Sequence, residues 1–316
     1  MDAPRIVILT GPTATGKTAL AIEFATRYGA DIISADSRQV YRYLDIGTAK
    51  PTAEQQAAVP HHLINVVNPD EQFDGARFRT DAQRIIAEAS QRGKRVLVVG
   101  GTGLYLRALT RGLFEGPPAN PPLRAQLQEQ ERAGGKGFLH RWLSRVDPPT
   151  AARLHPNDVL RQIRALEVFL LTEIPMSRWQ QEHGFRERPF PTLLLSLMCD
   201  RETLYRRIEA RCRHMLRDGL VEELRQVWAM GYDPALPVFQ TIGYAQMGAV
   251  LQGRLGQEDA LTQMATETKR LAKRQLTWLR VEPNVRWFSP VQEREMTTAL
   301  EIFWNEGHRA DDIPGI

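Results

Sequence analysis

The sequence has few of the features that mark secreted, membrane-bound or zinc-binding proteins. It contains two cysteines, Cys199 and Cys212, which form no CxxC motif and are too few for a disulfide framework. Residues 1–4 carry no basic segment leading into an apolar one, and no apolar run is long enough to cross a bilayer. The seven histidines are scattered without zinc-site spacing. We therefore expect a cytoplasmic protein without a membrane partner.

The overall composition is that of an ordinary globular protein. With 316 residues, 42% of them apolar and 25% charged, the chain is long enough for about two domains. The net charge is only +4, but the isoelectric point is 9.2 and the positive charge is unevenly distributed. This unevenness favours an anionic partner larger than a single diphosphate.

One segment near the N-terminus has the pattern of a phosphate-binding loop. An apolar run at 5–10, expected as a strand, leads into it, and apolar residues at helical spacing follow it. Its backbone N–H groups and one lysine favour a diphosphate or polyphosphate, and the threonine that ends it is a candidate Mg²⁺ ligand. A chance turn between strand and helix is the alternative. The segment consists of Gly11, Pro12, Thr13, Ala14, Thr15, Gly16, Lys17 and Thr18.

Two later strand ends also point to a ligand site. A short strand expected at 30–34 leads to Asp36, which either faces the phosphate loop or serves as a turn or helix-capping residue. The clearest central strand, at 95–99, ends in Gly-Gly-Thr-Gly at 100–103. An ATPase or GTPase usually has an acid there, so its absence weighs against triphosphate hydrolysis. The glycines and Thr102 indicate either close approach to a ligand or a simple turn.

The remaining apolar periods predict where the sheet continues. Further strands are expected at 63–67 and 191–198, and a helix over 74–92. The sequence therefore predicts an α/β fold: a P-loop NTPase-like parallel sheet core with helices on both faces.

A proline-rich linker at 116–122 separates this core from a region with helical periods and no convincing strand. We expect residues 121–187 to form a mostly helical insertion domain that moves as a lid. The core domain is then formed by 1–120 and 188–316.

Two helices in the C-terminal half carry basic residues of interest. In the first, which follows Asp200, Arg211 falls at the edge of the apolar arc, a weak sign of a site residue against the default of a surface arginine. In the second, 268–280 contains five cations and no acid, with Lys269 and Lys273 among the cations on one side. We expect that side to contact a polyanion, although a solvated helix face is the alternative.

Together these segments resemble the bacterial tRNA dimethylallyltransferase family, also called tRNA isopentenyltransferases. The resemblance runs in family order through nearly the whole chain, and the combination of motifs is highly specific. The matching segments are Gly-Pro-Thr-Ala-Thr-Gly-Lys-Thr (11–18), Asp-Ser-Arg-Gln-Val-Tyr (36–41), Leu-Asp-Ile-Gly-Thr-Ala-Lys-Pro (44–51), Gly-Gly-Thr-Gly-Leu-Tyr (100–105), Arg-Gln-Ile-Arg-Ala-Leu-Glu (161–167), Ile-Gly-Tyr (242–244) and Lys-Arg-Gln-Leu-Thr-Trp (273–278).

The resemblance implies a reaction and a set of roles. A dimethylallyl group would pass from dimethylallyl diphosphate to N6 of the adenosine 3′ of the tRNA anticodon, position 37, with Mg²⁺ on Thr18. Asp36 would be the base, Arg211 would hold the diphosphate with the loop, and Thr102 would complete the catalytic group. The residues implied at the tRNA anticodon stem-loop are Asp36, Ser37, Arg38, Gln39, Thr102, Arg124, Leu160, Arg161, Gln162, Ile163 and Arg164, to which the charge pattern adds Lys269 and Lys273.

Two other interpretations compete with this one. A small-molecule kinase with 121–187 as its lid would turn over a nucleoside triphosphate and ignore tRNA. An RNA-binding module with a vestigial phosphate loop would bind tRNA and form no product. We expect a monomer in each case.

Overall fold

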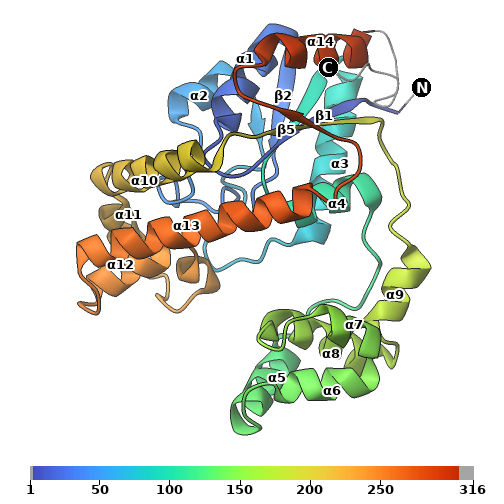
Figure 1. Ribbon diagram of the computed structural model, residues 1–316, viewed down its shortest axis with the longest axis vertical. Coiled ribbons are helices and arrows are strands. Elements are labelled where there is room, and N and C mark those ends of the chain that lie inside the picture. Colours follow the sequence, from blue (N-terminus) through green and yellow to red (C-terminus); the bar gives the residue numbers. More distant parts are fainter. Residues whose placement is uncertain (1–2, 306–316) are drawn as a thin grey trace. The chain divides into compact units, whose positions relative to one another are not determined.

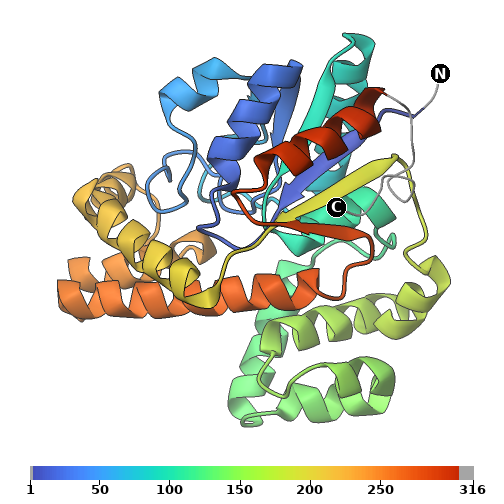
Figure 2. The same cartoon turned by 45° about the horizontal axis from the view of Figure 1, so that its top comes forward.

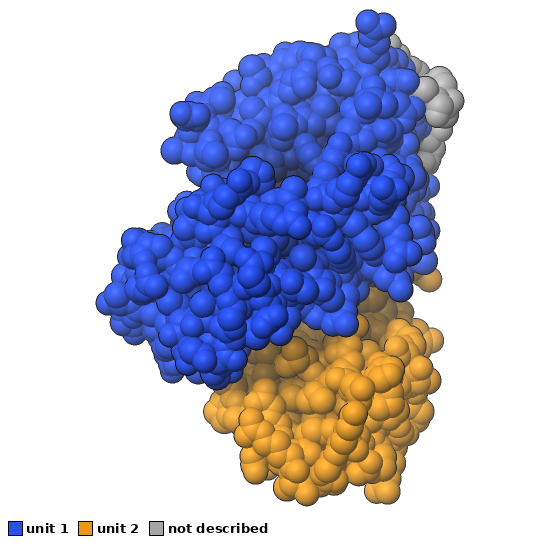
Figure 3. Space-filling model, turned by 60° about the vertical axis from the view of Figure 1, so that its left-hand side comes forward, with its two compact units in different colours: residues 1–110, 188–316 blue, residues 111–187 orange. Residues whose placement is uncertain are grey.

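The computed structural model describes residues 3–305, which form two compact units. The described part of the first contains residues 3–110 and 188–305, and the second contains residues 111–187 (Figure 3). The sequence placed the start of the insertion at 121, whereas the second unit begins ten residues earlier, at Arg111. Within the described part, no helix is both long and apolar enough to cross a membrane.

A six-stranded sheet forms the centre of the first unit (Figures 1 and 2). Its order is β3-β2-β4-β1-β5-β6, and each neighbouring pair is parallel. Because β1 lies between β4 and β5, the loop that follows β1 emerges at the middle of the carboxyl edge, where ligands bind in open α/β sheets. The strands are β1 (Ile6–Thr10), β2 (Ala30–Ser34), β3 (His61–His62), β4 (Arg95–Val99), β5 (Thr192–Leu197) and β6 (Val285–Phe288).

Helices cover both faces of this sheet, as expected from strands that are apolar on both sides. In β1, Ile6 and Ile8 pack into the core beneath α3 (Gly75–Gln91) and α4 (Gly103–Arg111). The alternate residues, Val7 and Leu9, pack into the opposite core. That core lies beneath α1 (Lys17–Tyr28) and α14 (Glu293–Asn305).

A third apolar core joins the helices that follow β5 to the loop after β2. Buried side chains of these helices pack around Leu44 and Tyr244. The long helix α13 packs against α10 and α12, and its C-terminal part reaches the carboxyl edge of the sheet through Gln275. The elements of this core are α10 (Arg201–Arg217), α11 (Leu220–Ala229), η1 (Pro237–Gln240), α12 (Tyr244–Leu251) and α13 (Gln257–Leu279). Helix α2 (Ala53–Ala58) lies outside it, against α1.

The second unit is helical throughout and has its own core of leucine, isoleucine and alanine side chains. Asp158 caps α8 by accepting a hydrogen bond from the Arg161 N–H. The unit contains α5 (Pro121–Ala133), α6 (Phe138–Val146), α7 (Pro148–Arg153), α8 (Val159–Thr172) and α9 (Met176–His183).

One predicted strand is wrong, and two short observed strands, β3 and β6, were not predicted. Residues 63–67 form an irregular loop in which Leu63 and Asn65 have positive φ angles of 61° and 57°, which no strand tolerates. The apolar side chains of Leu63, Val66 and Val67 still pack into the core, which explains why the sequence resembles that of a strand. The missed strand β6 is four residues long, too short to give a clear period.

Candidate functional site

The loop between β1 and α1 has the backbone of a phosphate-binding loop. Gly11 and Gly16 have φ angles of 134° and 96°, and a Cβ on Gly11 would lie 2.5 Å from the Leu197 carbonyl oxygen of β5. The buried Thr15 hydroxyl donates to the Pro12 carbonyl at 2.8 Å, which closes the curl. The loop therefore presents its amides at the N-terminus of α1, where the helix dipole favours an anion.

Lys17 is the first residue of α1, and its ammonium is held over the loop. It donates to the carbonyl oxygens of Gly11 at 2.9 Å and Pro12 at 2.8 Å. Burial, together with repulsion from Arg211, lowers the pKa of Lys17 to about 7, against the opposing attraction of Asp36. A cation that loses its proton this readily lacks a compensating anion, which a bound diphosphate would supply.

Arg211 reaches the same loop from α10. Its Nη2 donates to the Thr13 hydroxyl at 2.6 Å, while its buried Nε has no hydrogen-bond partner in the described chain. Burial lowers the pKa of Arg211, with Asp36 partly offsetting that effect. Within residues 3–305, neither Lys17 nor Arg211 has a carboxylate at ion-pair distance. Two uncompensated cations beside one phosphate loop form an anion site.

Gln275 of α13 holds the loop from another side. Its side-chain oxygen accepts from the Thr13 N–H at 2.8 Å, and its Nε2 donates to the Gly101 carbonyl at 3.1 Å. A Cβ on Gly101 would lie 2.3 Å from that Nε2. A Cβ on Gly100 would lie 2.2 Å from the Ala35 carbonyl oxygen, so this turn requires glycine for close approach to backbone, whatever it does toward a ligand.

Asp36 and Thr102 lie together at the ends of β2 and β4. One oxygen of Asp36 accepts from the Arg38 N–H at 2.8 Å, so the turn role left open by the sequence is real. The Thr102 hydroxyl accepts from the Ser37 N–H at 3.0 Å and fixes the same turn. The second oxygen of Asp36 accepts no hydrogen bond within the described residues and is available to a ligand.

Most of these groups line one cavity of about 440 Å³ in the first unit; Lys17 is not among its lining residues and lies behind Thr13 on the loop. Thr13 and Arg211 line one part of it, and Asp36, Ser37, Arg38 and Thr102 line another. Side chains from α10, α12, α13 and the segment before α12 supply apolar walls; they are Cys212, Met215, Ile242, Tyr244, Met264 and Leu271. The cavity thus combines an anion site, a carboxylate and an apolar compartment.

In the second unit, several of the basic residues that the resemblance implied as tRNA contacts already bind a carboxylate of the protein. Glu167 is fully buried and accepts from Arg124 at 2.8 and 2.9 Å and from Arg164 at 2.6 Å. Burial alone would raise the pKa of Glu167, but these bonds and the Asn120 N–H lower it to about 2. Neighbouring Leu160 is exposed and Arg161 pairs with Asp158, while Gln162 and Ile163 are buried.

The cations on one side of α13 within 268–280, which we call the basic stripe, are also less uniformly available than the sequence indicates. Lys269 donates to Glu209 of α10 and lies 5.2 Å from the centroid of the Tyr205 ring. Arg270 pairs with Glu267, and Lys273 and Arg274 are exposed without an ion pair in the described chain. The acids that neutralise part of the stripe lie outside the 268–280 window.

Comparison with known proteins identifies the family. The family model for IPP transferase matches residues 39–282, and that for isopentenyl transferase matches residues 4–65. A relative from Syntrophus aciditrophicus, named tRNA dimethylallyltransferase 2, is 50% identical over 94% of this chain and 95% of its own length. One from Geobacter metallireducens, named tRNA dimethylallyltransferase, is 48% identical over 90% of this chain and 93% of its own. The chain belongs to the tRNA dimethylallyltransferase family.

Solved structures of this family share the fold. The full-length tRNA isopentenylpyrophosphate transferase from Bacillus halodurans is 36% identical, with a TM-score of 0.70 over 96% of this chain and 99% of that one. A eukaryotic dimethylallyltransferase described as acting on tRNA is 26% identical, with a TM-score of 0.81 over 96% and 80%. The fold is therefore the predicted P-loop NTPase-like one, and the chain is a prenyltransferase rather than a small-molecule kinase.

Several residues that build the site were not predicted from the sequence. Gln275 was quoted only as part of a motif, although it is a polar residue on the side of α13 that carries Leu271 and Leu279, a signal of a buried polar contact. Met215 and Met264 gave no signal beyond that of core residues. Glu223 of α11 holds the loop at 44–50, part of which lines the cavity, and nothing in its local sequence indicates that contact.

Proposed function

We propose that this chain transfers the dimethylallyl group of dimethylallyl diphosphate to N6 of the adenosine 3′ of the anticodon, position 37 of tRNA, and releases diphosphate. One observation carries the proposal. A single cavity is lined by Arg211 and Thr13 of the anion site, by the Asp36 carboxylate and by apolar side chains. A triphosphate-hydrolysing enzyme needs no such apolar compartment beside its phosphate loop.

The anion site acts on the leaving group. As the bond between C1 of the dimethylallyl group and the diphosphate oxygen breaks, negative charge develops on the diphosphate. Arg211 and the loop amides lie beside this charge, and Lys17 exchanges its bonds to the Gly11 and Pro12 carbonyl oxygens for bonds to the diphosphate. Preoriented electrostatic stabilisation of this kind usually contributes more to an enzyme's rate enhancement than any other single effect.

Asp36 acts on the nucleophile. The N6 lone pair of adenine is delocalised into the ring, so the amine attacks weakly. As the N6–C1 bond forms, an N6 proton becomes acidic and passes to the unoccupied oxygen of Asp36. To reach this position the adenosine leaves its stack, at a cost of a few kcal/mol.

The apolar walls hold the hydrocarbon tail. Cys212, Met215 and Met264 lie on two packed helices, α10 and α13, and line the same cavity as Arg211. A five-carbon branched chain placed against them is removed from water while its diphosphate reaches the cations. Methionine adapts its shape to such irregular apolar surfaces.

Thr18 is the proposed Mg²⁺ ligand. Within residues 3–305 no three His, Cys, Asp or Glu side chains converge to hold a metal. An ion that keeps several waters and takes phosphate oxygens fits a single hydroxyl at the start of α1. When bound with the substrate, Mg²⁺ supplies further charge stabilisation for the diphosphate.

The tRNA contacts implied by the resemblance divide into available and occupied side chains. Arg38, and Lys273 from the charge pattern, are exposed and available to phosphates. Gln39 already accepts from the Ser34 hydroxyl at 2.9 Å and donates to the Ala49 carbonyl at 3.1 Å, so its contribution would come through the backbone it holds. The monomeric state stays a prediction from sequence.

A mass-spectrometric assay tests the proposal. The full chain is incubated with dimethylallyl diphosphate, Mg²⁺ and tRNA, and the digested tRNA is analysed for prenylated adenosine. The wild type should form it, and Asp36→Asn should slow single-turnover transfer by about 10²–10⁴-fold with tRNA affinity within a few-fold. Absence of product overturns the proposal, whereas an unaffected Asp36→Asn variant removes only the base assignment.

A further inference from the structure

A short loop between β2 and α2 forms one wall of the cavity, and its backbone is irregular. We name residues 44–50 the wall loop; Gly47, Thr48 and Ala49 line the cavity with Asp36. Tyr43, just before it, and Ala49, within it, have positive φ angles of 66° and 51°. A non-glycine residue holds such a conformation only where surrounding contacts enforce it.

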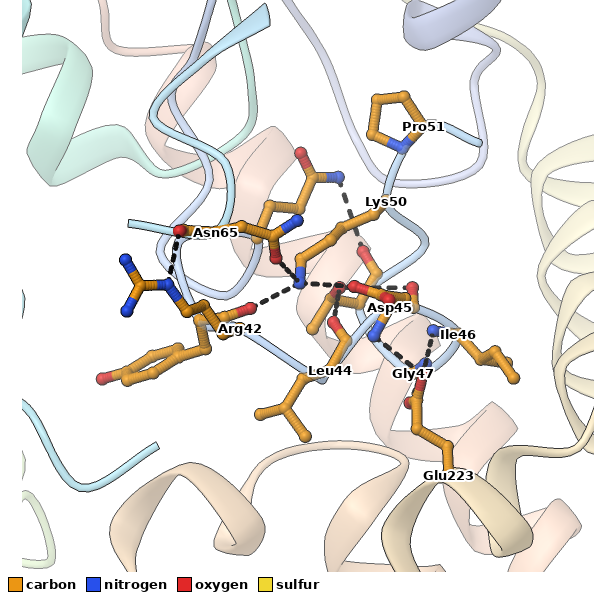
Figure 4. Close-up of polar contacts among 12 residues, drawn as sticks. Arg42, Leu44, Asp45, Ile46, Gly47, Lys50, Pro51, Asn65 and Glu223 are labelled. Carbon is orange, nitrogen blue, oxygen red and sulfur yellow. Dashed lines mark hydrogen bonds and ion pairs between the residues drawn. The ribbon is translucent and has the colours of Figure 1, made fainter. Parts of the chain in front are cut away.

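Two side chains hold the wall loop on the side of the sheet (Figure 4). Lys50, whose side chain is 2% exposed, donates to Asp45 at 2.7 Å, to Asn65 at 2.6 Å and to the Tyr41 carbonyl. Gln39 donates to the Ala49 carbonyl. These bonds involve one backbone carbonyl of the loop, that of Ala49, and none of the N–H groups of residues 45–47, which have another partner.

That partner is Glu223 in the first turn of α11, more than 170 residues away in sequence. Its Oε2 accepts from the Asp45 N–H at 2.8 Å and the Ile46 N–H at 2.7 Å, and its Oε1 accepts from the Gly47 N–H at 3.2 Å (Figure 4). Three successive backbone N–H groups that converge on one anion form a nest, which binds a carboxylate strongly.

Tyr244 of α12 completes the clamp. Its hydroxyl donates to Glu223 Oε1 at 2.6 Å, and burial, aided by that carboxylate, raises the pKa of Tyr244 so that the hydroxyl stays protonated. A Cβ on Gly47 would lie 2.4 Å from the Tyr244 ring. Glu223 therefore accepts four hydrogen bonds that tie two helices to the cavity wall.

We infer that Glu223 is a positioning residue for the proposed transfer reaction: it fixes the wall loop against the substrate cavity without contacting substrate. The inference rests on the proposed function for its catalytic consequence. None of the bonds of Glu223 reaches Thr13, Lys17 or Arg211, so the clamp shapes the wall of the cavity and leaves the anion site intact.

The test uses Glu223→Gln, which turns one of the two accepting oxygens into an N–H donor facing N–H groups. Misplacement of the wall by about 1 Å is expected to lower kcat/KM for prenyl transfer about 10- to 100-fold. The affinity for dimethylallyl diphosphate without tRNA should change less than about twofold, because the anion site is untouched. Amide hydrogen exchange at residues 45–47 should accelerate about tenfold or more in the variant.

Matched variants separate positioning from general damage. Glu222→Gln changes the adjacent, exposed glutamate, which pairs with Arg225, and should leave both exchange and transfer at wild-type values. Tyr244→Phe removes one of the four bonds and should give a smaller loss of the same kind. If Glu223→Gln does not fold, Tyr244→Phe carries the test.

The outcomes distinguish the inference from the proposed function. Unchanged amide exchange in Glu223→Gln shows that the clamp does not hold the loop and overturns the inference. Faster exchange with unchanged kcat/KM overturns it as well. So does a loss of affinity for dimethylallyl diphosphate as large as the loss of kcat/KM. A wild-type chain that forms no prenylated adenosine overturns the proposed function itself, and with it the catalytic role of the clamp.

Discussion

Two groups of buried or half-buried cations in this protein differ in whether a carboxylate neutralises them. In the first unit, Lys17 and Arg211 hydrogen-bond to neutral oxygens, and burial lowers the pKa of each. In the second unit, Arg124 and Arg164 bind the buried carboxylate of Glu167. The first pair lacks an anion, and the second pair already has one.

The difference explains which basic residues indicate a ligand. A half-buried cation without a counter-charge costs free energy, and a protein that retains two of them beside one phosphate loop recovers that energy when an anion binds. Arginines that surround a buried carboxylate instead organise the local fold. Position in a family motif does not separate the two cases, whereas the partner of each side chain does.

The sharpest test of the comparison removes one uncompensated cation. Arg211→Met should lower kcat for prenyl transfer by about 10²–10³-fold, because the diphosphate loses a preoriented donor as its charge develops. Arg213→Met is the matched control, since this exposed neighbour lies on the other side of the same helix. Equal effects of the two substitutions would contradict a special role for Arg211.

A second test breaks the compensated group. Glu167→Gln should destabilise the second unit by roughly 2–4 kcal/mol, because two arginines lose their buried carboxylate. The pKa of Glu167 lies near 2 in the folded chain, below the ordinary 4.5. Its contribution is therefore present above about pH 4.5 and lost as pH falls toward 2.

Thermal unfolding of the full chain measures this effect, with Glu129→Gln as the control because Glu129 forms only an exposed pair with Arg132. Two results would show that Glu167, Arg124 and Arg164 do not act as a structural unit. One is a Glu167→Gln protein that is as stable as the control at pH 7. The other is a Glu167→Gln protein whose stability falls as steeply at acid pH as that of the wild type.

A third test uses pH to detect the missing anion of Lys17. Its pKa is about 7 in the free protein and should rise when diphosphate binds. The affinity for dimethylallyl diphosphate should then be highest below pH 7 and fall by up to about tenfold per pH unit above it. Calorimetric titration without tRNA measures this affinity. The Lys17→Met variant should bind dimethylallyl diphosphate more weakly, and its affinity should not show the fall above pH 7. A wild-type affinity that is flat from pH 7 to 9 would contradict the assignment.

The parts of the fold that could be predicted are those set by local sequence. The apolar strand before Gly11, the loop glycines and the cap at Asp158 each depend on a few adjacent residues. The loop at 63–67 was mistaken for a strand because its side chains are buried while its backbone turns through positive φ. The family resemblance indicated the reaction, and local rules alone indicated only a phosphate site.

The parts of the site that could not be predicted depend on contacts between distant segments. Gln275 reaches Thr13 across 262 positions, and Glu223 reaches Gly47 across 176. Lys269 is neutralised by Glu209, which lies on another helix, so a charge count within one segment overstates the free positive charge. No periodicity contains that information.

The smallest expected effect separates two lysines on the same helix. Lys273→Ala should lower the slope of log tRNA affinity against log salt by about 0.7–0.9, the value for one lost phosphate contact. Lys269→Ala should change it by much less, because Lys269 already pairs with Glu209. Equal changes would show that the pair opens when tRNA binds and that the stripe acts as one surface.

A crystal structure with a non-reactive thiolo analogue of dimethylallyl diphosphate tests directly whether the loop from Gly11 to Thr18 and Arg211 hold the diphosphate. We predict diphosphate oxygens within hydrogen-bond distance of the loop amides, of Lys17 Nζ and of the Arg211 guanidinium, with the hydrocarbon against Met215 and Met264. A diphosphate bound elsewhere, with this loop still closed on Lys17 as in the free protein, would contradict the account.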